Sequence, residues 1–164
     1  MLALNIQGAD GRTETINISE EKLEDLDKIN EEILTRDQIK NYIDNFNIPS
    51  EVKVFLNSIV NLTCKIGDMI YNIGKKILEI LIYISKEFPN TTIGLIIGFV
   101  IGTLISSIPL IGWLLSGIIL PASIFAGSLA GAYYDISDKA TKQTINKYLD
   151  EMFGAFKDLN LGKK

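Results

Sequence analysis

The side chains that could carry out chemistry are few, and their spacing matches no catalytic arrangement. The chain has no histidine and one cysteine, Cys64, which lies in apolar sequence without an activating partner and is interpreted as a buried structural thiol. The acidic pairs Glu20/Glu21 and Glu31/Glu32 fall in strongly polar sequence, where solvated surface residues are expected. The serines have no histidine to activate them. The sequence therefore predicts no enzyme, no metal site and no cofactor.

Nucleotide and nucleic-acid binding are disfavoured as well. Gly94, Gly98 and Gly102 do not have the spacing of a phosphate-binding loop, and no Lys-Ser or Lys-Thr pair follows them. Residues 1–51 carry twelve acidic and five basic side chains, and they account for the acidic pI of the chain. Phosphate binding needs clustered Lys or Arg, so no nucleic-acid partner is expected.

The dominant feature is the segment 88–134, which has 47 residues and no Asp, Glu, Lys or Arg. About 20 apolar residues cross the hydrocarbon core of a bilayer as a helix. Two such spans fit here, Thr92 to Ile108 and Leu110 to Tyr134, with Pro109 in the turn between them. The sequence therefore predicts a transmembrane helical hairpin.

Small residues recur along each of these two spans at a spacing of four, which places them on one ridge of a helix. In lipid, close approach over small residues is a main source of attraction between helices. We therefore expect these ridges to be helix contacts, within one chain or between copies in a homo-oligomer. The ridges are Gly94, Gly98, Gly102 and Ser106 in the first span, and Ser123, Gly127 and Gly131 in the second.

This pattern resembles the glycine-zipper membrane segments of pore and channel proteins. The resemblance covers about 40 residues and rests on the glycines of the two ridges. The layout, with amphipathic helices before a long apolar hairpin, is also similar to colicin-type pore-forming domains. Here about 30 residues follow the hairpin, whereas in colicin-type domains it lies close to the C-terminus. The resemblance implies membrane insertion and self-association.

Residues flanking the hairpin predict its orientation and its interface contacts. Lysines lie on both sides of the segment and none lies in its turn, so both termini are expected to face the cytoplasm. Aromatic residues near the ends of the second span are expected at the membrane interface. The predicted interface residues are Trp113, Tyr133, Tyr134, Lys86 and Lys139.

Amphipathic elements are expected on either side of the hairpin. Short alternating runs at 2–7 and 13–18, with Asp10-Gly11 between them, indicate a small β-hairpin. Ser19 is a suitable N-cap for a helix over 20–34, and Thr35 with Gln38 fits a capping box before a second helix that ends before Pro49. Apolar residues from 145 to 156 indicate a C-terminal helix that packs on the bundle or lies on the membrane.

For residues 51–88 the sequence predicts one long helix, or two helices broken near Gly67 or Gly74. The apolar residues of this stretch fall in a seven-residue repeat. Isoleucine in both rows of such a repeat favours assemblies of more than two strands, so this helix is a candidate oligomerisation stem. The alternative is a core helix of a small bundle. The stem residues are Val52, Leu56, Ile59, Ile66, Ile70, Ile73, Ile77, Ile80 and Ile84.

The sequence thus predicts an all-α fold: an amphipathic helical bundle with a two-helix apolar transmembrane hairpin and a small N-terminal β-hairpin. Its segments are an N-terminal arm over 1–18, a helical region over 19–88, the hairpin over 89–134 and a C-terminal helix over 135–164. The leading functional hypothesis is a self-associating integral membrane protein that forms or gates a pore in the lipid bilayer, as a toxin or ion-transport protein would. The alternative is a membrane-anchored structural or adaptor protein, such as a virion or secretion-assembly component, whose residues 1–50 bind a protein partner. A third interpretation keeps the apolar hairpin inside a soluble bundle.

Overall fold

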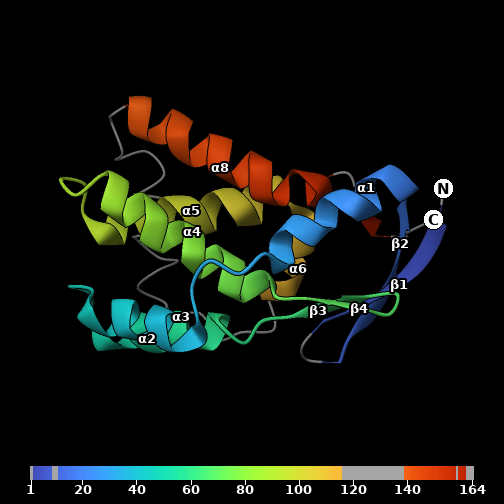
Figure 1. The fold of residues 1–164 in the computed structure, drawn as a ribbon, viewed down its shortest axis with the longest axis horizontal. Helices are drawn as coiled ribbons and strands as arrows, with labels where there is room; N and C mark the ends of the chain where they lie inside the picture. The colour runs from blue at the N-terminus through green and yellow to red at the C-terminus, as the bar shows by residue number, and fades with distance from the viewer. Residues whose placement is uncertain (1, 9–10, 116–138, 158, 162–164) are drawn as a thin grey trace.

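A computed structural model describes residues 2–8, 11–115, 139–157 and 159–161. It shows a mixed α/β fold with an antiparallel sheet at one end and helices packed together at the other (Figure 1). The strand order is β4-β3-β1-β2-β5. The predicted all-α class is therefore wrong.

The N-terminal β-hairpin is confirmed. Strands β1 (Leu2–Gly8) and β2 (Thr13–Ile18) pair from Leu2 with Ile18 to Gln7 with Thr13. Gly11, in the connection, has a φ of 88°, which glycine adopts without strain. Alternation along the strands turns Ile6, Ile16 and Ile18 into the core while their neighbours face solvent.

Of the two alternatives predicted for 51–88, the single long helix is wrong, and the chain forms two helices with a break around Gly67, where a second β-hairpin lies. The chain forms α3 (Ser50–Ile59), then β3 (Cys64–Ile66), β4 (Met69–Tyr71) and α4 (Ile73–Glu87). Gly67 and Asp68 make the two-residue turn, with Ile66 paired to Met69 and a φ of 59° at Gly67. Glycine at the first of two turn positions suits a hairpin whose twist matches its strands.

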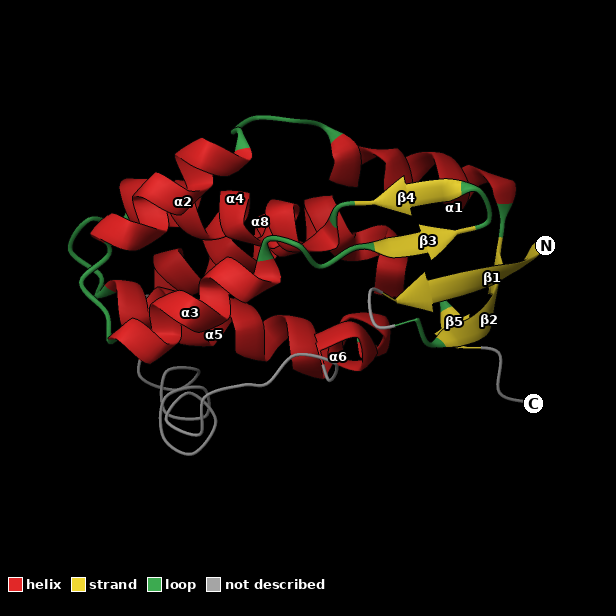
Figure 2. Cartoon of the chain, turned by 90° about the horizontal axis from the view of Figure 1, so that it is seen from below, coloured by secondary structure: helices red, strands yellow, loops and turns green. Residues whose placement is uncertain are grey.

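The predicted oligomerisation stem is consequently divided among two helices and two strands. The seven-residue repeat predicted a helix for the β-branched residues around Gly67. These residues instead form β3 and β4, which extend the sheet beside β1 (Figure 2). Most stem residues are buried in the core of the monomer, whereas Ile70 is 57% exposed. Val52, Leu56 and Ile59 lie in α3, Ile66 in β3, Ile70 in β4, and Ile73, Ile77, Ile80 and Ile84 in α4.

Helix α4 runs through the middle of the helical part and contacts α2, α3, α5, α8 and the 3₁₀ helix η1. Every residue from Ile73 to Ile82 is buried. At its start, a Cβ added to Gly74 would lie 1.6 Å from the carbonyl oxygen of Ile59, and the Gly74 N–H donates to Leu62 O at 2.9 Å. Glycine is required here because the end of α3 touches the α4 backbone.

The first helix of the charge-free segment is α5 (Ile93–Ser107), and α6 (Pro109–Leu115) follows it. The predicted first span matches α5 in its limits, but α5 packs against α4, α6 and α8 in the protein interior. No described helix is by itself both long and apolar enough to cross a bilayer, although α5 and α6 together meet the length and composition, with a bend of 116° between them. The straight pair of transmembrane helices is therefore not the arrangement of the described residues, and most of the predicted second span lies outside them.

The amphipathic helices cover this interior. Ser19 caps α1 (Glu20–Asp25), which continues as η1 (Leu26–Asn30), and the predicted Thr35/Gln38 capping box is present at α2 (Arg36–Asn45). The predicted C-terminal helix is α8 (Lys139–Lys157), which packs on the bundle. It turns Ile145, Leu149, Phe153 and Phe156 into the core. After α8, β5 (Asn160–Leu161) pairs with β2.

Candidate functional site

Three charged side chains in the first half of α4 are buried among apolar residues. Lys75, Lys76 and Glu79 are only 5%, 2% and 5% exposed. Lys and Glu are almost never buried to this extent unless they are paired. We call these three residues the charge cluster.

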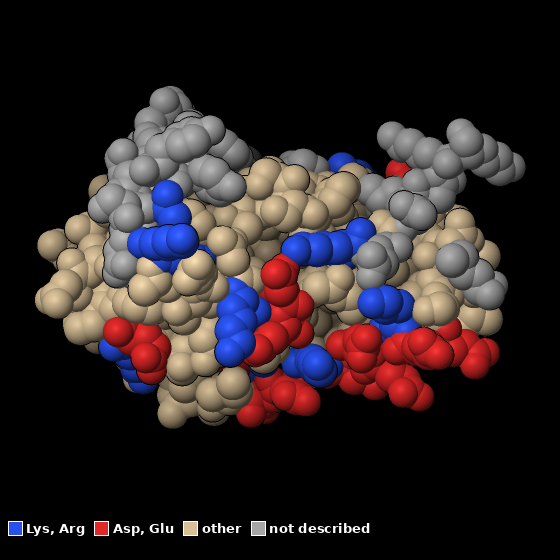
Figure 3. All heavy atoms as spheres, turned by 90° about the horizontal axis from the view of Figure 1, so that it is seen from above, with Lys and Arg blue, Asp and Glu red and all other residues tan. Residues whose placement is uncertain are grey.

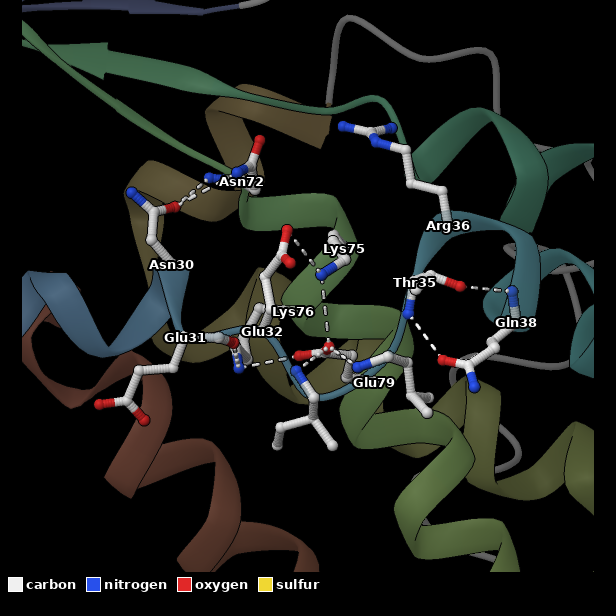
Figure 4. Close-up of polar contacts among 12 residues, drawn as sticks. Asn30, Glu31, Glu32, Thr35, Arg36, Gln38, Asn72, Lys75, Lys76 and Glu79 are labelled. Carbon is white, nitrogen blue, oxygen red and sulfur yellow. Dashed lines mark hydrogen bonds and ion pairs between the residues drawn. The ribbon is translucent and has the colours of Figure 1, made fainter.

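The carboxylate of Glu79 is the centre of the charge cluster (Figure 4). Its Oε2 accepts hydrogen bonds from the backbone N–H groups of Ile33 at 3.0 Å and Leu34 at 2.8 Å. Its Oε1 lies 2.8 Å from Nζ of Lys76. Oε2 therefore has hydrogen-bond partners in the segment before α2, and Oε1 has an ion-pair partner on the preceding turn of α4.

The two lysines bind the same segment, residues 31–35, which we call the connector. Nζ of Lys76 donates to the carbonyl oxygen of Glu31 at 2.7 Å. Nζ of Lys75 lies 3.5 Å from Glu32 and 3.6 Å from Glu79. Because the first of these bonds is buried and charge-assisted, it holds the connector more firmly than the ion pair to the exposed Glu32.

Both ends of the connector are fixed by side-chain hydrogen bonds. At its start, Asn30 donates to Ile70 O at 2.7 Å and accepts from Asn72 N–H at 2.9 Å. At its end, Thr35 N–H donates to the Gln38 side chain at 2.9 Å, and Gln38 N–H donates to Thr35 Oγ1 at 3.1 Å. The connector is thus pinned across α4 by the charge cluster and at each end by its neighbours (Figure 4).

These contacts set the protonation of Glu79. Burial by itself would raise its pKa, but the hydrogen bonds from Lys76, Leu34 and Ile33 and the charge of Lys76 outweigh burial and lower the pKa below its usual range. Glu79 is therefore ionised at neutral pH and has no proton to give as a general acid. Burial raises the pKa of the Cys64 thiol to about 12, so this thiol is a poor nucleophile near neutral pH.

A groove with a volume of about 320 Å³ lies beside the charge cluster, between the connector, α4 and α8. Its surface is mostly apolar, and Lys76 and Glu79 are among the residues that line it. On one wall the hydroxyls of Tyr83 and Tyr148 are 2.7 Å apart. The lining residues are Ile33, Leu34, Lys76, Glu79, Ile80, Ile82, Tyr83, Lys86, Tyr148 and Met152.

The residues of the first glycine ridge differ in their exposure. Gly98 is buried, Gly94 and Gly102 are half-buried and Ser106 is exposed. A Cβ on Gly94 would meet nothing within 4 Å. The second ridge, Ser123, Gly127 and Gly131, lies outside the described residues.

The predicted interface residues that the structure describes lie in three different helices. Trp113, in α6, is half-buried, and the Arg12 guanidinium lies 5.0 Å from its ring and donates to its carbonyl oxygen at 2.8 Å. Lys86 is exposed at the end of α4, with Nζ 4.4 Å from the ring centre of Tyr42. Lys139 is exposed at the start of α8. Tyr133 and Tyr134 are outside the described residues.

The sequence analysis did not predict the charge cluster, and it named Gly74 only as a possible helix break, not as a close contact with Ile59. The signal for the cluster was a spacing of three and four residues between opposite charges in a run that is otherwise isoleucine and leucine. Lys75 and Lys76 are among the lysines that precede the charge-free segment, for which the sequence predicts only a role in orienting the hairpin. No spacing rule indicates that a carboxylate would bind N–H groups 45 residues earlier in the chain.

Comparison with protein families, curated proteins and solved structures finds no match to this chain.

Proposed function

We propose that this protein permeabilises lipid bilayers, and that the charge-free segment 88–134 is the part that inserts. In the described structure the start of that segment is packed in the interior. The proposal therefore requires two states of the protein, the compact state described above and a membrane-bound state in which copies of the segment associate.

The observation that carries the proposal is that α5 is apolar on all of its faces. Its buried side carries Ile97, Val100 and Leu104, and its half-buried positions are also apolar, with Leu95 and Ile105. A helix that is hydrophobic all round belongs in the core of a large protein or in a membrane. Helix α5 is therefore as compatible with a bilayer as with the protein interior in which it lies here.

The covering elements support a change of state. Helix α8 shields α5 with an amphipathic face, and such a face can lie at a membrane surface as well as on a protein core. The connector is held by the charge cluster on α4, not by α5. Release of α5 would therefore leave the buried charges paired.

Dye release from liposomes tests the proposal, with Ile105→Asp as the key variant. Ile105 is half-buried, so an aspartate there can reach solvent in the compact state, whereas an aspartate within a membrane span opposes insertion, by up to about 3 kcal/mol at the bilayer centre. We expect this variant to lose most of the release. Ile70→Asp is the matched control, because Ile70 is 57% exposed in β4, outside the segment.

Both variants must first show the circular dichroism and unfolding temperature of the parent. If Ile105→Asp is destabilised, Leu95→Asp at the other end of α5 replaces it. Release that is equal for all variants, or absent for the parent protein, contradicts insertion of this segment.

A second candidate function is that of an adaptor whose acidic N-terminal part binds a protein. It is favoured by the exposed carboxylates of α1, which gather at one end of the molecule (Figure 3). Glu20, Glu21, Glu24 and Asp25 are all exposed. Membrane-bound oligomers that release no dye would support this function over the pore.

A further inference from the structure

The groove between the connector, α4 and α8 has the properties of a small-molecule site. Its volume of about 320 Å³ falls at the lower end of the range for ligand pockets, roughly 300–1,000 Å³. Like such pockets, it has an apolar surface and a few polar groups. None of its described lining residues belongs to the charge-free segment, so the site proposed here does not use the part that is proposed to insert.

The shape of the groove suits a single extended chain. The residues that α4 contributes run from Lys76 to Lys86, which corresponds to about 15 Å along the helix at 1.5 Å per residue. Ile80 and Ile82 are apolar along this length, and Met152 faces them from α8. Met is a side chain that adapts its shape to apolar ligands.

One edge of the groove is formed by an isoleucine whose side chain is exposed to solvent. Ile33 is 73% exposed, and its backbone N–H is fixed by Glu79 at 3.0 Å. The opposite wall carries Tyr83, which is 40% exposed. A connector held so firmly keeps Ile33 at the groove, where the side chain gains burial only if the groove is occupied.

The two ends of the groove differ in charge. At the inner end, Lys76 and Glu79 neutralise each other. At the outer end Lys86 lies over the ring of Tyr42, a contact that orients the ammonium without neutralising it, and no described carboxylate is within ion-pair distance of it. Glu87 is next in sequence, but its contact is with Tyr83.

From this arrangement we propose that the groove binds a single-chain amphiphile with an anionic headgroup, such as a fatty acid. The alkyl chain lies along α4 between Ile33 and Met152, and the carboxylate accepts hydrogen bonds from Lys86. The hydrogen-bonded hydroxyls of Tyr83 and Tyr148 border the chain. The proposal does not depend on membrane insertion of the segment 88–134.

Titration of the full chain with dodecanoate below its micellar concentration tests this site. We expect saturable binding of one molecule per chain by calorimetry. With ¹³C-methyl methionine, the Met152 resonance should shift on binding, while Met69, which is 51% exposed in β4, should not. Dodecyltrimethylammonium, with the same chain and the opposite charge, should bind at least tenfold more weakly, because one charge-assisted contact is lost and one repulsion gained.

Two pairs of variants separate the headgroup from the chain. Lys86→Gln should weaken dodecanoate binding about tenfold, as expected for loss of one charged partner, while Lys139→Gln should not change it. Ile33→Glu should abolish binding, while Ile70→Glu, at another exposed isoleucine, should not. All four substituted residues are exposed, so the variants are expected to fold. A Met152 resonance that stays fixed, equal binding of the cationic amphiphile, or no saturable binding would overturn the proposal.

Discussion

Helices α4 and α5 have fifteen residues each and both lie in the interior, but they are held there in different ways. Helix α4 carries three buried charges whose partners lie on the connector and on α4 itself. Helix α5 has no charge, and its buried Thr103 hydroxyl has no hydrogen-bond partner among the described residues. Buried charges tie a helix to one set of neighbours, whereas apolar packing can be exchanged for another apolar medium. This difference is why we propose that α5, and not α4, leaves the compact state for the bilayer.

The largest effect is expected from Glu79→Gln in α4. This change leaves Lys75 and Lys76 buried without their carboxylate, and breaking a buried pair typically costs about 3–5 kcal/mol. Urea unfolding of the variant should show a loss of that size. Glu87→Gln, on the exposed end of the same helix, is the matched control and should change the free energy of unfolding by less than about 0.5 kcal/mol.

The pH dependence gives a second measure of the same carboxylate. The folded pKa of Glu79 lies below its unfolded value, so its contribution is fully present above the ordinary carboxyl range, near pH 4.3, and is lost as the pH falls through the lowered folded pKa. The difference in stability between the parent protein and Glu79→Gln should therefore be constant near neutrality and shrink below about pH 4. A difference that is unchanged down to pH 2 would show that this carboxylate does not hold the connector.

A pair of glycine substitutions contrasts the two helices directly. Gly74→Ala places a methyl group on the Ile59 carbonyl, and we expect destabilisation by about 1–3 kcal/mol or more, because backbone must move. Gly94→Ala meets nothing within 4 Å and should stabilise the compact state by about 0.4–1 kcal/mol through helix propensity. Thermal unfolding checks both. Equal losses in the two variants would mean that α5 is packed as tightly as α4.

A small effect, similar in size to that of Gly94→Ala, is expected at Thr103. Thr103→Val replaces a buried hydroxyl without a partner by a methyl group, which should stabilise the protein by about 1 kcal/mol, since an unsatisfied polar group is removed from the interior. Thr144→Val in α8, where the exposed hydroxyl bonds the Ala140 carbonyl at 2.9 Å, is the control and should not stabilise. Loss of stability in Thr103→Val would indicate that this hydroxyl is satisfied in solution.

Local sequence signals predicted the elements that depend on near neighbours. The hairpin around Gly11, the N-cap at Ser19 and the capping box of Thr35 with Gln38 all follow from contacts within a few residues. The limits of the helix over 92–108 and the packed face of the C-terminal helix were also predicted closely.

Features that depend on distant partners were not predicted. The isoleucine repeat over 52–84 fitted a long helix as well as it fits the observed helix, hairpin and helix, and only the Gly67-Asp68 turn distinguishes them. The role of Glu79 depends on Ile33 and Leu34, and the need for glycine at 74 depends on the Ile59 carbonyl. Neither contact leaves a periodic pattern in the sequence.

The central claim is that α5 enters the bilayer while α4 stays outside, and labelling with an environment-sensitive dye tests it most directly. Single cysteines at Ile105 in α5 and at Tyr83 in α4 can be labelled selectively, because burial and a pKa of about 12 protect Cys64 near neutral pH. With liposomes that contain nitroxide lipids, we predict that the Ile105 dye brightens and is quenched by nitroxides deep in the acyl chains, while the Tyr83 dye is not. Quenching at both positions or at neither would contradict the account.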